Sequence, residues 1–292
     1  MNFPELVLGT VQFGLKYGVS NRQGKVDEAE AEKILDLSFA NGIRVLDTAI
    51  AYGDSESILG KLNQGRFEVV TKLPSIPKNC SSPGSWTTDS IKESFERLRI
   101  QKLKGLLLHD PSILSSQFGR EVYSRIRDFI DEGKIEKFGI SIYSYRDLEL
   151  IPDFVSYDII QTPMNVFDRK FLTSGWLEKM NTDGILIQVR SIFLQGLLLM
   201  ESSNRPQYFF PWNKHLEQWD KWLQDNKIEP LEACIKYIQS IQGISQIVFG
   251  VESVFHLREI LSFCQKKNEI LFPNYLASED EGLINPSLWK LT

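Results

Sequence analysis

The sequence has little cysteine and no cluster of metal-binding side chains. Its 292 residues include three cysteines, Cys80, Cys234 and Cys264, which are far apart and odd in number. This spacing matches neither a disulfide framework nor a metal-ligand motif. We therefore expect reduced thiols, as is usual in a cytoplasm, and no bound metal.

Long apolar runs and a large net charge are also missing. No run approaches the about 20 apolar residues that span a bilayer. The opening MNFPELVLGT lacks the basic segment and long apolar run of a signal peptide. The formal net charge is −5, which gives no reason to expect nucleic acid or an anionic membrane as a partner. We expect a cytoplasmic protein.

What the sequence does contain is one unit repeated along the chain. Short runs rich in valine and isoleucine alternate with longer amphipathic stretches. Each run is mostly apolar rather than alternating, which is typical of parallel strands covered on both faces. The eight runs are 6–14, 43–52, 67–73, 104–110, 137–143, 157–165, 184–191 and 246–251.

The stretches between the runs have the apolar spacing of amphipathic helices. Residues 27–42 predict a helix with Asp27 as its N-terminal cap. Residues 87–100 predict another helix, capped by Thr87 or Thr88. Before the last strand we expect a long loop and then two helices, at about 199–213, 214–225 and 230–241.

This alternation predicts an α/β fold, a (β/α)₈ TIM barrel, because eight strand–helix units fit into about 250 residues. The rival is a doubly wound sheet, whose dinucleotide-binding turn has a glycine spacing that Gly9, Gly14 and Gly18 lack. Length alone suggests two domains, but barrels of this size form one. We therefore expect residues 1–292 to form a single domain, with 264–292 as a C-terminal extension over the barrel mouth.

Polar side chains stand at the ends of these strands, on the face where barrels carry reactive groups. Asp47 ends the second strand and Lys72 ends the third. Because these strands are neighbours, the two side chains can form an ion pair. Tyr52 follows in the loop after Asp47. A cation near Tyr52 favours its phenolate and lowers its pKa from about 10, so that Tyr52 can donate a proton near neutral pH.

His109 ends the fourth strand. There it can hydrogen-bond a substrate oxygen and polarise a carbonyl group. The combination suits protonation of an oxygen that gains negative charge, and it includes no activated nucleophile. Hydride addition to a carbonyl creates that charge, with a nicotinamide as the source of the hydride.

At these motifs the sequence resembles the aldo-keto reductase superfamily, over nearly the whole chain. The matching stretches are LGTVQFG, LDTAIAYGDSE, VVTKL, LLLHDP, GIS, IIQTPMN and IVFGVES. The resemblance implies reduction of a small aldehyde or ketone with NADP(H) or NAD(H). It also implies a catalytic set, which is Asp47, Tyr52, Lys72 and His109 in this sequence.

The resemblance further implies which residues hold the nicotinamide. Ser141 and Gln161 match the side chains that bind its carboxamide, and Thr10 matches a residue beside its ribose. The family's Ser-Asn pair is Ser141-Ile142 here. Its stacking aromatic is replaced by Arg190, which can stack or bind an anionic group.

The segment after the last strand bears on the choice of cofactor. The family often places basic residues there against the 2′-phosphate of NADPH, followed by a Glu-Asn pair for the adenine. In this sequence Gly250 begins the segment and Glu259 matches the glutamate, whereas His256 and Ile260 replace the arginine and the asparagine. Glu252 would repel a phosphate. NADP(H) and NAD(H) therefore both stay open.

Other interpretations stay open as well. Asp47 and Lys72 could be a structural pair that closes the barrel mouth, and Ser141 and Gln161 could satisfy backbone groups. A nucleotide-binding regulatory subunit with little turnover would keep the same fold. A Schiff-base aldolase would use Lys72 as its nucleophile, although a lysine paired with a carboxylate stays charged.

The loops expected to select the substrate show no motif, and nothing in the sequence indicates an oligomeric state. These loops are 74–86, 199–213 and 265–292. The second loop contains an aromatic run at 208–212. This run either covers a substrate or packs the loop.

Overall fold

The computed structural model describes residues 3–265 and 270–291. Eight parallel strands form a closed barrel, in which each strand pairs with the next and β8 pairs with β1. The strands are β1 (Glu5–Gly9), β2 (Val45–Asp47), β3 (Glu68–Leu73), β4 (Leu103–Leu108), β5 (Ile135–Ser141), β6 (Ile159–Pro163), β7 (Leu186–Arg190) and β8 (Gln246–Gly250). The predicted barrel and its eight strands are confirmed, and most strands are shorter than the apolar runs that predicted them.

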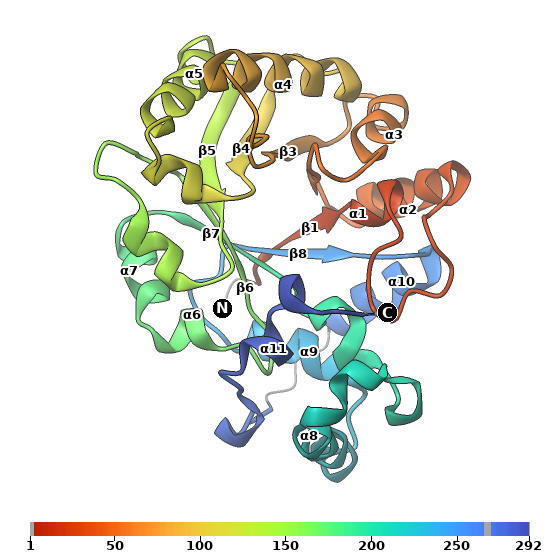
Figure 1. The fold of residues 1–292 in the computed structure, drawn as a ribbon. Helices are drawn as coiled ribbons and strands as arrows, with labels where there is room; N and C mark the ends of the chain where they lie inside the picture. The colour runs from red at the N-terminus through yellow and green to blue at the C-terminus, as the bar shows by residue number, and fades with distance from the viewer. Residues whose placement is uncertain (1–2, 266–269, 292) are drawn as a thin grey trace.

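Helices surround the barrel, as Figure 1 shows. The α-helices are α1 (Val11–Gly14), α2 (Glu28–Ala40), α3 (Ser55–Leu62), α4 (Pro83–Leu98), α5 (Gly119–Asp131), α6 (Lys170–Thr173), α7 (Trp176–Thr182), α8 (Asn213–Asn226), α9 (Pro230–Gln239), α10 (Val254–Cys264) and α11 (Glu281–Ile284). Short 3₁₀ segments are η1 (Pro111–Ser115), η2 (Tyr145–Leu150), η3 (Leu194–Leu199), η4 (Ser202–Asn204), η5 (Gln207–Trp212), η6 (Asn274–Leu276) and η7 (Pro286–Leu288). Within the described ranges no helix is both long and apolar enough to cross a membrane.

The starts of two helices test the predicted caps. Asp27 caps α2, and its side chain accepts a hydrogen bond from Glu30 N at 2.8 Å. The predicted cap at Thr87 or Thr88 is wrong, because α4 already begins at Pro83. Proline suits the first turn of a helix, where its missing N–H costs nothing. Thr87 lies inside α4 and donates to the Pro83 carbonyl at 2.8 Å.

The barrel interior is built in layers. An apolar layer is formed by Val7, Val45, Val70, Leu107, Ile159 and Val248. Side chains alternate across a strand, so the residue two positions further along points in the same direction. The layer above, toward the carboxyl ends of the strands, therefore contains the polar strand-end residues named in the sequence, including Asp47, Lys72, His109 and Gln161. This alternation places them in one layer of the barrel interior.

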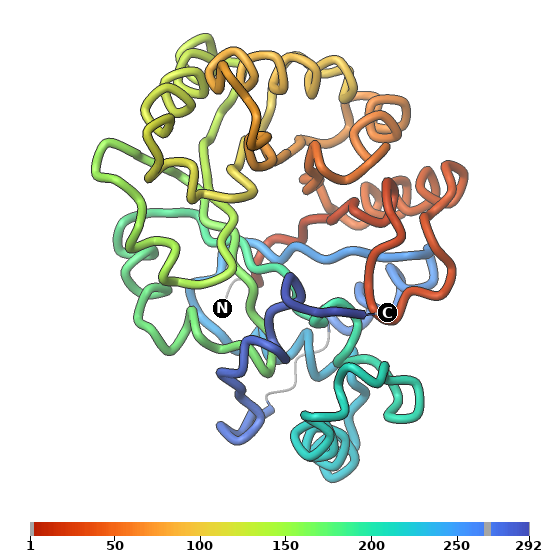
Figure 2. The backbone as a smooth tube through the Cα atoms, viewed as in Figure 1, coloured from red at the N-terminus to blue at the C-terminus, as the bar shows by residue number. Residues whose placement is uncertain are grey.

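The C-terminal segment packs against the loops that follow β6 and β7 (Figure 2). Phe209 is buried and its ring contacts Trp289, with centroids 4.8 Å apart. Trp212 donates from its indole N–H to Asp280 at 2.8 Å. The aromatic run at 208–212 therefore packs its loop against this segment. Of the predicted extension, residues 266–269 and 292 lie outside the described residues.

Candidate active site

Asp47 and Lys72 form a buried ion pair at the carboxyl end of the barrel interior. Lys72 Nζ lies 2.6 Å from Asp47 Oδ1 and also donates to the Thr48 carbonyl at 2.8 Å. Their side chains are 4% and 1% exposed for Asp47 and Lys72, respectively. Burial lowers the pKa of Lys72, and the Asp47 carboxylate opposes that shift. The ion pair predicted from the two neighbouring strands is present.

Tyr52 and His109 lie beside this pair with their rings in edge-to-face contact. The ring centroids are 5.7 Å apart at an interplanar angle of 81°. Lys72 Nζ lies 5.1 Å from the centroid of the Tyr52 ring. The loop that carries Tyr52 passes so close to α1 that a Cβ at Gly14 would lie 1.6 Å from the Tyr52 carbonyl oxygen. Only glycine at position 14 therefore lets Tyr52 reach this place.

Tyr52 is a neutral phenol in this environment. Burial raises its pKa well above the usual value and the Asp47 carboxylate raises it further, whereas Arg190 lowers it. The prediction that Lys72 lowers the pKa of Tyr52 is wrong. Desolvation penalises the phenolate, and Asp47 offsets the positive charge of Lys72.

His109 is a neutral imidazole near neutral pH. Burial lowers its pKa to about 4, and the positive charges of Lys72 and Arg190 act in the same direction. The Asp110 carboxylate opposes the shift. A neutral imidazole has one N–H donor and one acceptor nitrogen. His109 can therefore donate a hydrogen bond to an oxygen without carrying a charge.

Three glutamines continue the hydrogen bonding from Asp47 through the barrel. Gln161 Nε2 donates to Asp47 Oδ2 at 2.8 Å and to Gln188 Oε1 at 3.1 Å. Gln188 Nε2 donates to Gln246 Oε1 at 2.6 Å, and Gln246 Nε2 donates to Glu5 at 2.5 Å. The strand register pairs these residues in the same order. We call Gln161, Gln188 and Gln246 the amide ladder.

The amide ladder limits what Gln161 can offer a ligand. Both of its amide hydrogens are directed at Asp47 and Gln188. Ser141 Oγ lies 3.4 Å from Gln161 Oε1. Ser141 and Gln161 thus contact each other and are buried, and binding of a carboxamide here stays a prediction.

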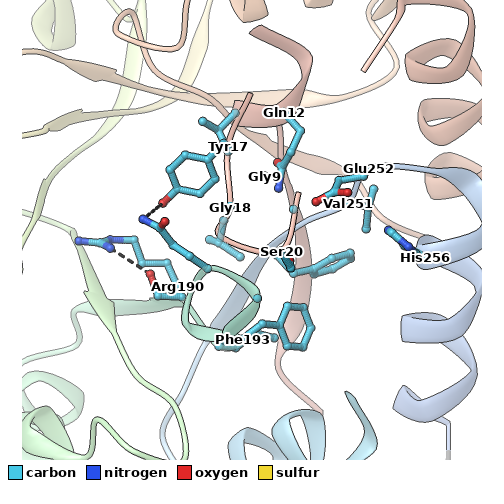
Figure 3. A pocket seen from close by; sticks show the side chains of 18 of the residues that line it. Gly9, Gln12, Tyr17, Gly18, Ser20, Arg190, Phe193, Val251, Glu252 and His256 are labelled. Carbon is cyan, nitrogen blue, oxygen red and sulfur yellow. Dashed lines mark hydrogen bonds between the residues drawn. The ribbon is translucent and has the colours of Figure 1, made fainter. Parts of the chain in front are cut away.

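A cavity of about 690 Å³ is lined by residues that include Tyr17, Arg190 and His256, as Figure 3 shows from close by. Of the ten residues predicted for the site, seven line it: Thr10, Asp47, Tyr52, His109, Arg190, Gly250 and Glu259. Lys72, Ser141 and Gln161 do not line it. Lys72 and Gln161 therefore act on the cavity through the groups they contact.

The cavity runs from Tyr52 to the start of α10. Glu252, His256, Glu259 and Ile260 line this far end. Burial raises the pKa of Glu252, and the charge of His256 opposes the shift. Among the described residues that line the cavity, Arg190 is the single lysine or arginine. The end at α10 is therefore acidic.

Gln12 has a buried polar atom on the cavity wall. Its Oε1 is buried and accepts no hydrogen bond from the described residues. A Cβ at Gly250 would lie 2.4 Å from this oxygen, so the glycine leaves room for the amide. Sequence reasoning missed Gln12, although a polar residue inside the motif LGTVQFG was a usable signal.

A second cavity of about 620 Å³ meets the first one at the end near His109. Ala51, His109 and Tyr143 line both cavities. The second cavity extends over the loops after β3, β4 and β5, where Ser75 and Asp110 lie on its wall. A small molecule in this second cavity would therefore reach His109 from the side away from α10.

Arg190 reaches across the barrel mouth from the end of β7. Its Nη2 donates to the Ile142 carbonyl at 3.1 Å, and its Nη1 donates to Ser191 Oγ at 3.2 Å. Its guanidinium lies 4.5 Å from the centroid of the Tyr143 ring. The side chain is thus fixed on the wall of the first cavity, against a residue that lines both cavities.

Sequence reasoning also missed Gln188 and Gln246. Both lie inside apolar strands, at Q in GILIQVRS and in QIVFGV. That is the same signal that singled out Gln161.

The chain is similar to known proteins along most of its length. The model of the aldo/keto reductase family matches residues 5–270. D-arabinose 1-dehydrogenase of Saccharomyces cerevisiae is 25% identical, with 91% of this chain and 86% of the yeast protein covered.

Solved structures with the same fold include two further oxidoreductases. One is an aldo-keto reductase from Bacillus halodurans in its holo form, with a TM-score of 0.74, 19% identity, and 92% of this chain and 89% of that chain covered. The other is a glycerol dehydrogenase from Gluconobacter oxydans, with a TM-score of 0.69, 17% identity, and coverage of 93% and 89%. The chain belongs to the aldo/keto reductase family.

Proposed function

We propose that this chain reduces an aldehyde or a ketone to an alcohol, with a bound nicotinamide dinucleotide as the hydride source and Tyr52 as the proton donor. The observation that carries this proposal is the contact between Tyr52 and His109 at one end of the first cavity, beside the buried Asp47–Lys72 pair. When bound, a reduced nicotinamide supplies a hydride to the carbonyl carbon.

The first cavity fits an extended dinucleotide. Its volume of about 690 Å³ lies within the usual range for cofactor sites. Gln12 Oε1 is an unused acceptor on its wall, suited to a ribose hydroxyl. Glu252 and Glu259 at the far end offer further acceptors for sugar and base donors. With the nicotinamide beside Tyr52, the residues of α10 would hold the adenosine.

Tyr52 acts as the acid in this proposal. Its raised pKa keeps the proton on the phenol at neutral pH. As the carbonyl carbon is reduced, its oxygen gains negative charge and takes the proton from Tyr52 Oη. The phenolate that forms is stabilised by Lys72, whose Nζ is 5.1 Å from the ring centroid, and by the positive charge of Arg190.

His109 and the ion pair fix the geometry of this step. Neutral His109 donates a hydrogen bond to the same carbonyl oxygen and so orients the carbonyl toward Tyr52. Asp47 holds Lys72 through the 2.6 Å contact. Gln161 holds the second carboxylate oxygen of Asp47. The resemblance in sequence and the geometry of the four side chains support the same assignment.

The charges near α10 support NAD(H) over NADP(H). Glu252 and Glu259 line that end, and Arg190 stands at the other end of the cavity. A 2′-phosphate placed near α10 would meet carboxylates rather than basic side chains, whereas a ribose 2′-hydroxyl can donate to a carboxylate. We therefore assign NAD(H) as the preferred cofactor.

Cofactor titration followed by turnover tests the proposal. Binding of NADH and of NADPH is followed by the quenching of tryptophan fluorescence, and oxidation of the bound cofactor is then measured with a panel of aldehydes. We expect NADH to bind more tightly than NADPH and to be oxidised by at least one aldehyde. Binding of neither cofactor, or binding without any turnover, would contradict the proposed activity.

A further inference from the structure

Arg190 lines the first cavity beside Tyr143, and it has no acidic partner among the residues that the structure describes. Its contacts are a backbone carbonyl, a hydroxyl and the Tyr143 ring. Among the residues described, no carboxylate oxygen lies within the 4.0 Å that defines an ion pair with its guanidinium. Half-buried arginines are usually paired with a carboxylate or a phosphate. The missing partner points to a ligand.

The neighbouring charges do not cancel that of Arg190. Asp47 and Lys72 offset each other. His109 is neutral at neutral pH, because its pKa is about 4, and Tyr17 is neutral, because its pKa is raised to about 12. Asp168 interacts with Arg190 at longer range. The two carboxylates of the second cavity, Asp110 and Asp147, already accept hydrogen bonds from the protein. Arg190 therefore keeps a half-buried positive charge near Tyr52.

Two of the five N–H donors of Arg190 are used by the protein, by Ile142 and by Ser191. Three donors are left, and they project from a planar group that the Tyr143 ring and two hydrogen bonds keep in place. A guanidinium held in this way presents two parallel N–H groups, the geometry that a carboxylate accepts. An ordered fork also loses little conformational freedom on binding.

The side from which a substrate enters indicates whether Arg190 contacts the substrate or the cofactor. In the proposed function the dinucleotide fills the first cavity from α10 to Tyr52. The substrate must then approach through the second cavity, which meets the first at Ala51, His109 and Tyr143. Arg190 lines the first cavity and packs on the ring of Tyr143, which lines both cavities, so its guanidinium is within reach of a substrate held at this junction.

We propose that Arg190 binds a carboxylate on the substrate, so that the enzyme prefers oxo acids, which are carbonyl compounds with a carboxylate a few bonds from the carbonyl group. This inference rests on the proposed reductase activity. It assigns Arg190 a role in specificity in addition to the effect of its charge on the Tyr52 phenolate. The guanidinium also holds the carbonyl oxygen near Tyr52 and His109, because it fixes the other end of a short substrate.

Matched pairs of substrates test the inference. We compare succinic semialdehyde with its methyl ester, and 4-carboxybenzaldehyde with methyl 4-formylbenzoate, at saturating NADH. For at least one pair, kcat/KM of the acid should exceed that of the ester by tenfold or more. In Arg190→Met this ratio should fall to about one, and Arg190→Lys should keep part of it. Using the ratio removes effects on folding and on cofactor binding that both substrates share.

A control variant separates a local contact from the net charge. Arg146 is exposed on η2 and lines neither cavity. Arg146→Met removes the same charge and should leave the ratio unchanged. In the wild type, succinate should inhibit competitively against the aldehyde, whereas succinamide should not. This last measurement needs no variant.

The outcomes also distinguish the two proposals. If the esters are reduced but no pair favours the acid, or if Arg190→Met keeps the preference, the role of Arg190 in substrate binding is overturned and the reductase activity stands. A loss of NADH affinity in Arg190→Met with an unchanged ratio would overturn it too, because Arg190 would then serve the cofactor. If no aldehyde is reduced at all, the reductase activity itself is overturned.

Discussion

The two ends of the first cavity, near Tyr52 and near α10, are built in different ways. At the catalytic end, Asp47 accepts hydrogen bonds from Lys72 and Gln161, both of which lie on strands of the barrel. At the far end, Glu252 lies between β8 and α10, beside His256 on that helix. One end is held by side chains that bond to each other across strands. The other end is a surface formed by a loop and a helix.

This difference indicates which residues can change the rate of the reaction and which can change the choice of cofactor. Residues of the catalytic end depend on one another, so a change in one alters the environment of the others. We expect residues of the far end to contact a ligand independently of one another. We therefore expect substitutions at the catalytic end to lower kcat and those at the far end to change cofactor choice. Four predictions test this division.

The largest effect is expected for Tyr52→Phe. The variant keeps the ring against His109 but lacks the proton that, in the proposed function, the carbonyl oxygen receives. We expect kcat to fall by about 10²- to 10⁴-fold, while the Kd for NADH changes by less than about threefold. Steady-state kinetics and fluorescence titration measure the two quantities. An unchanged kcat would remove Tyr52 from its assigned role.

The next effect concerns Gln188 in the amide ladder. Gln188→Leu leaves hydrogen-bonding groups of Gln161 and Gln246 without partners, which should lower the free energy of unfolding by about 1–3 kcal/mol. Gln246→Leu is the matched control, because it breaks the ladder one step further from Asp47. Both should lose stability in urea unfolding, but only Gln188→Leu should also lower kcat. Equal kinetic effects would mean that the ladder has a structural role alone.

The third prediction uses the pKa of His109. Folded His109 has a pKa of about 4, whereas the ordinary value is 6.5. Between these values the unfolded chain binds more protons, so the free energy of unfolding falls as the pH drops from 6.5 toward 4. Asp168, whose pKa is raised to about 6, acts in the opposite direction. Its contribution is the same in the wild type and in a variant that replaces only His109.

Replacement of His109 isolates its share of this pH dependence. We expect His109→Gln to lose less stability between pH 7 and pH 5 than the wild type, by on the order of 2 kcal/mol at most after allowing for partial exposure. Urea unfolding at the two pH values gives the comparison. A wild-type and a variant curve with the same pH dependence would show that His109 is protonated as easily in the folded state as in the unfolded one.

The smallest effect is expected at the far end. Glu252→Gln removes a carboxylate from the side of the cavity assigned to adenosine, so a 2′-phosphate meets less repulsion, by about 1–2 kcal/mol. The ratio of Kd values for NADPH and NADH should therefore shift toward NADPH by about tenfold. Glu201→Gln, an exposed change outside the cavity, is the control. A lower kcat with an unchanged ratio would break the division between the two ends.

Much of the fold followed from the sequence because the strand signal is strong. Runs buried on both faces stay apolar throughout, so a polar residue such as Asp47 or Lys72 stands out where its strand ends. Their pairing followed from the order of the strands in a barrel. The start of α4 was missed because Pro83 begins it four residues before Thr87, and no apolar period extends that far back.

The electrostatics of the site could not be read from the sequence. The direction of the Tyr52 pKa shift depends on how deeply the ring is buried and on Asp47, which neutralises the nearby lysine. Neither quantity is encoded in spacing along the chain. One of the two hydrogen bonds donated by the Gln161 amide likewise goes to Gln188, a residue from another strand. Such contacts need the register of the barrel before they can be named.

The amide ladder also restricts how this protein can evolve. Each glutamine in it both donates to one neighbour and accepts from another, or contacts a carboxylate at an end of the series. A single change to an apolar residue strands a donor or an acceptor on either side, and only a later second change can remove that cost. We therefore expect correlated substitutions at these three positions among descendants of this chain.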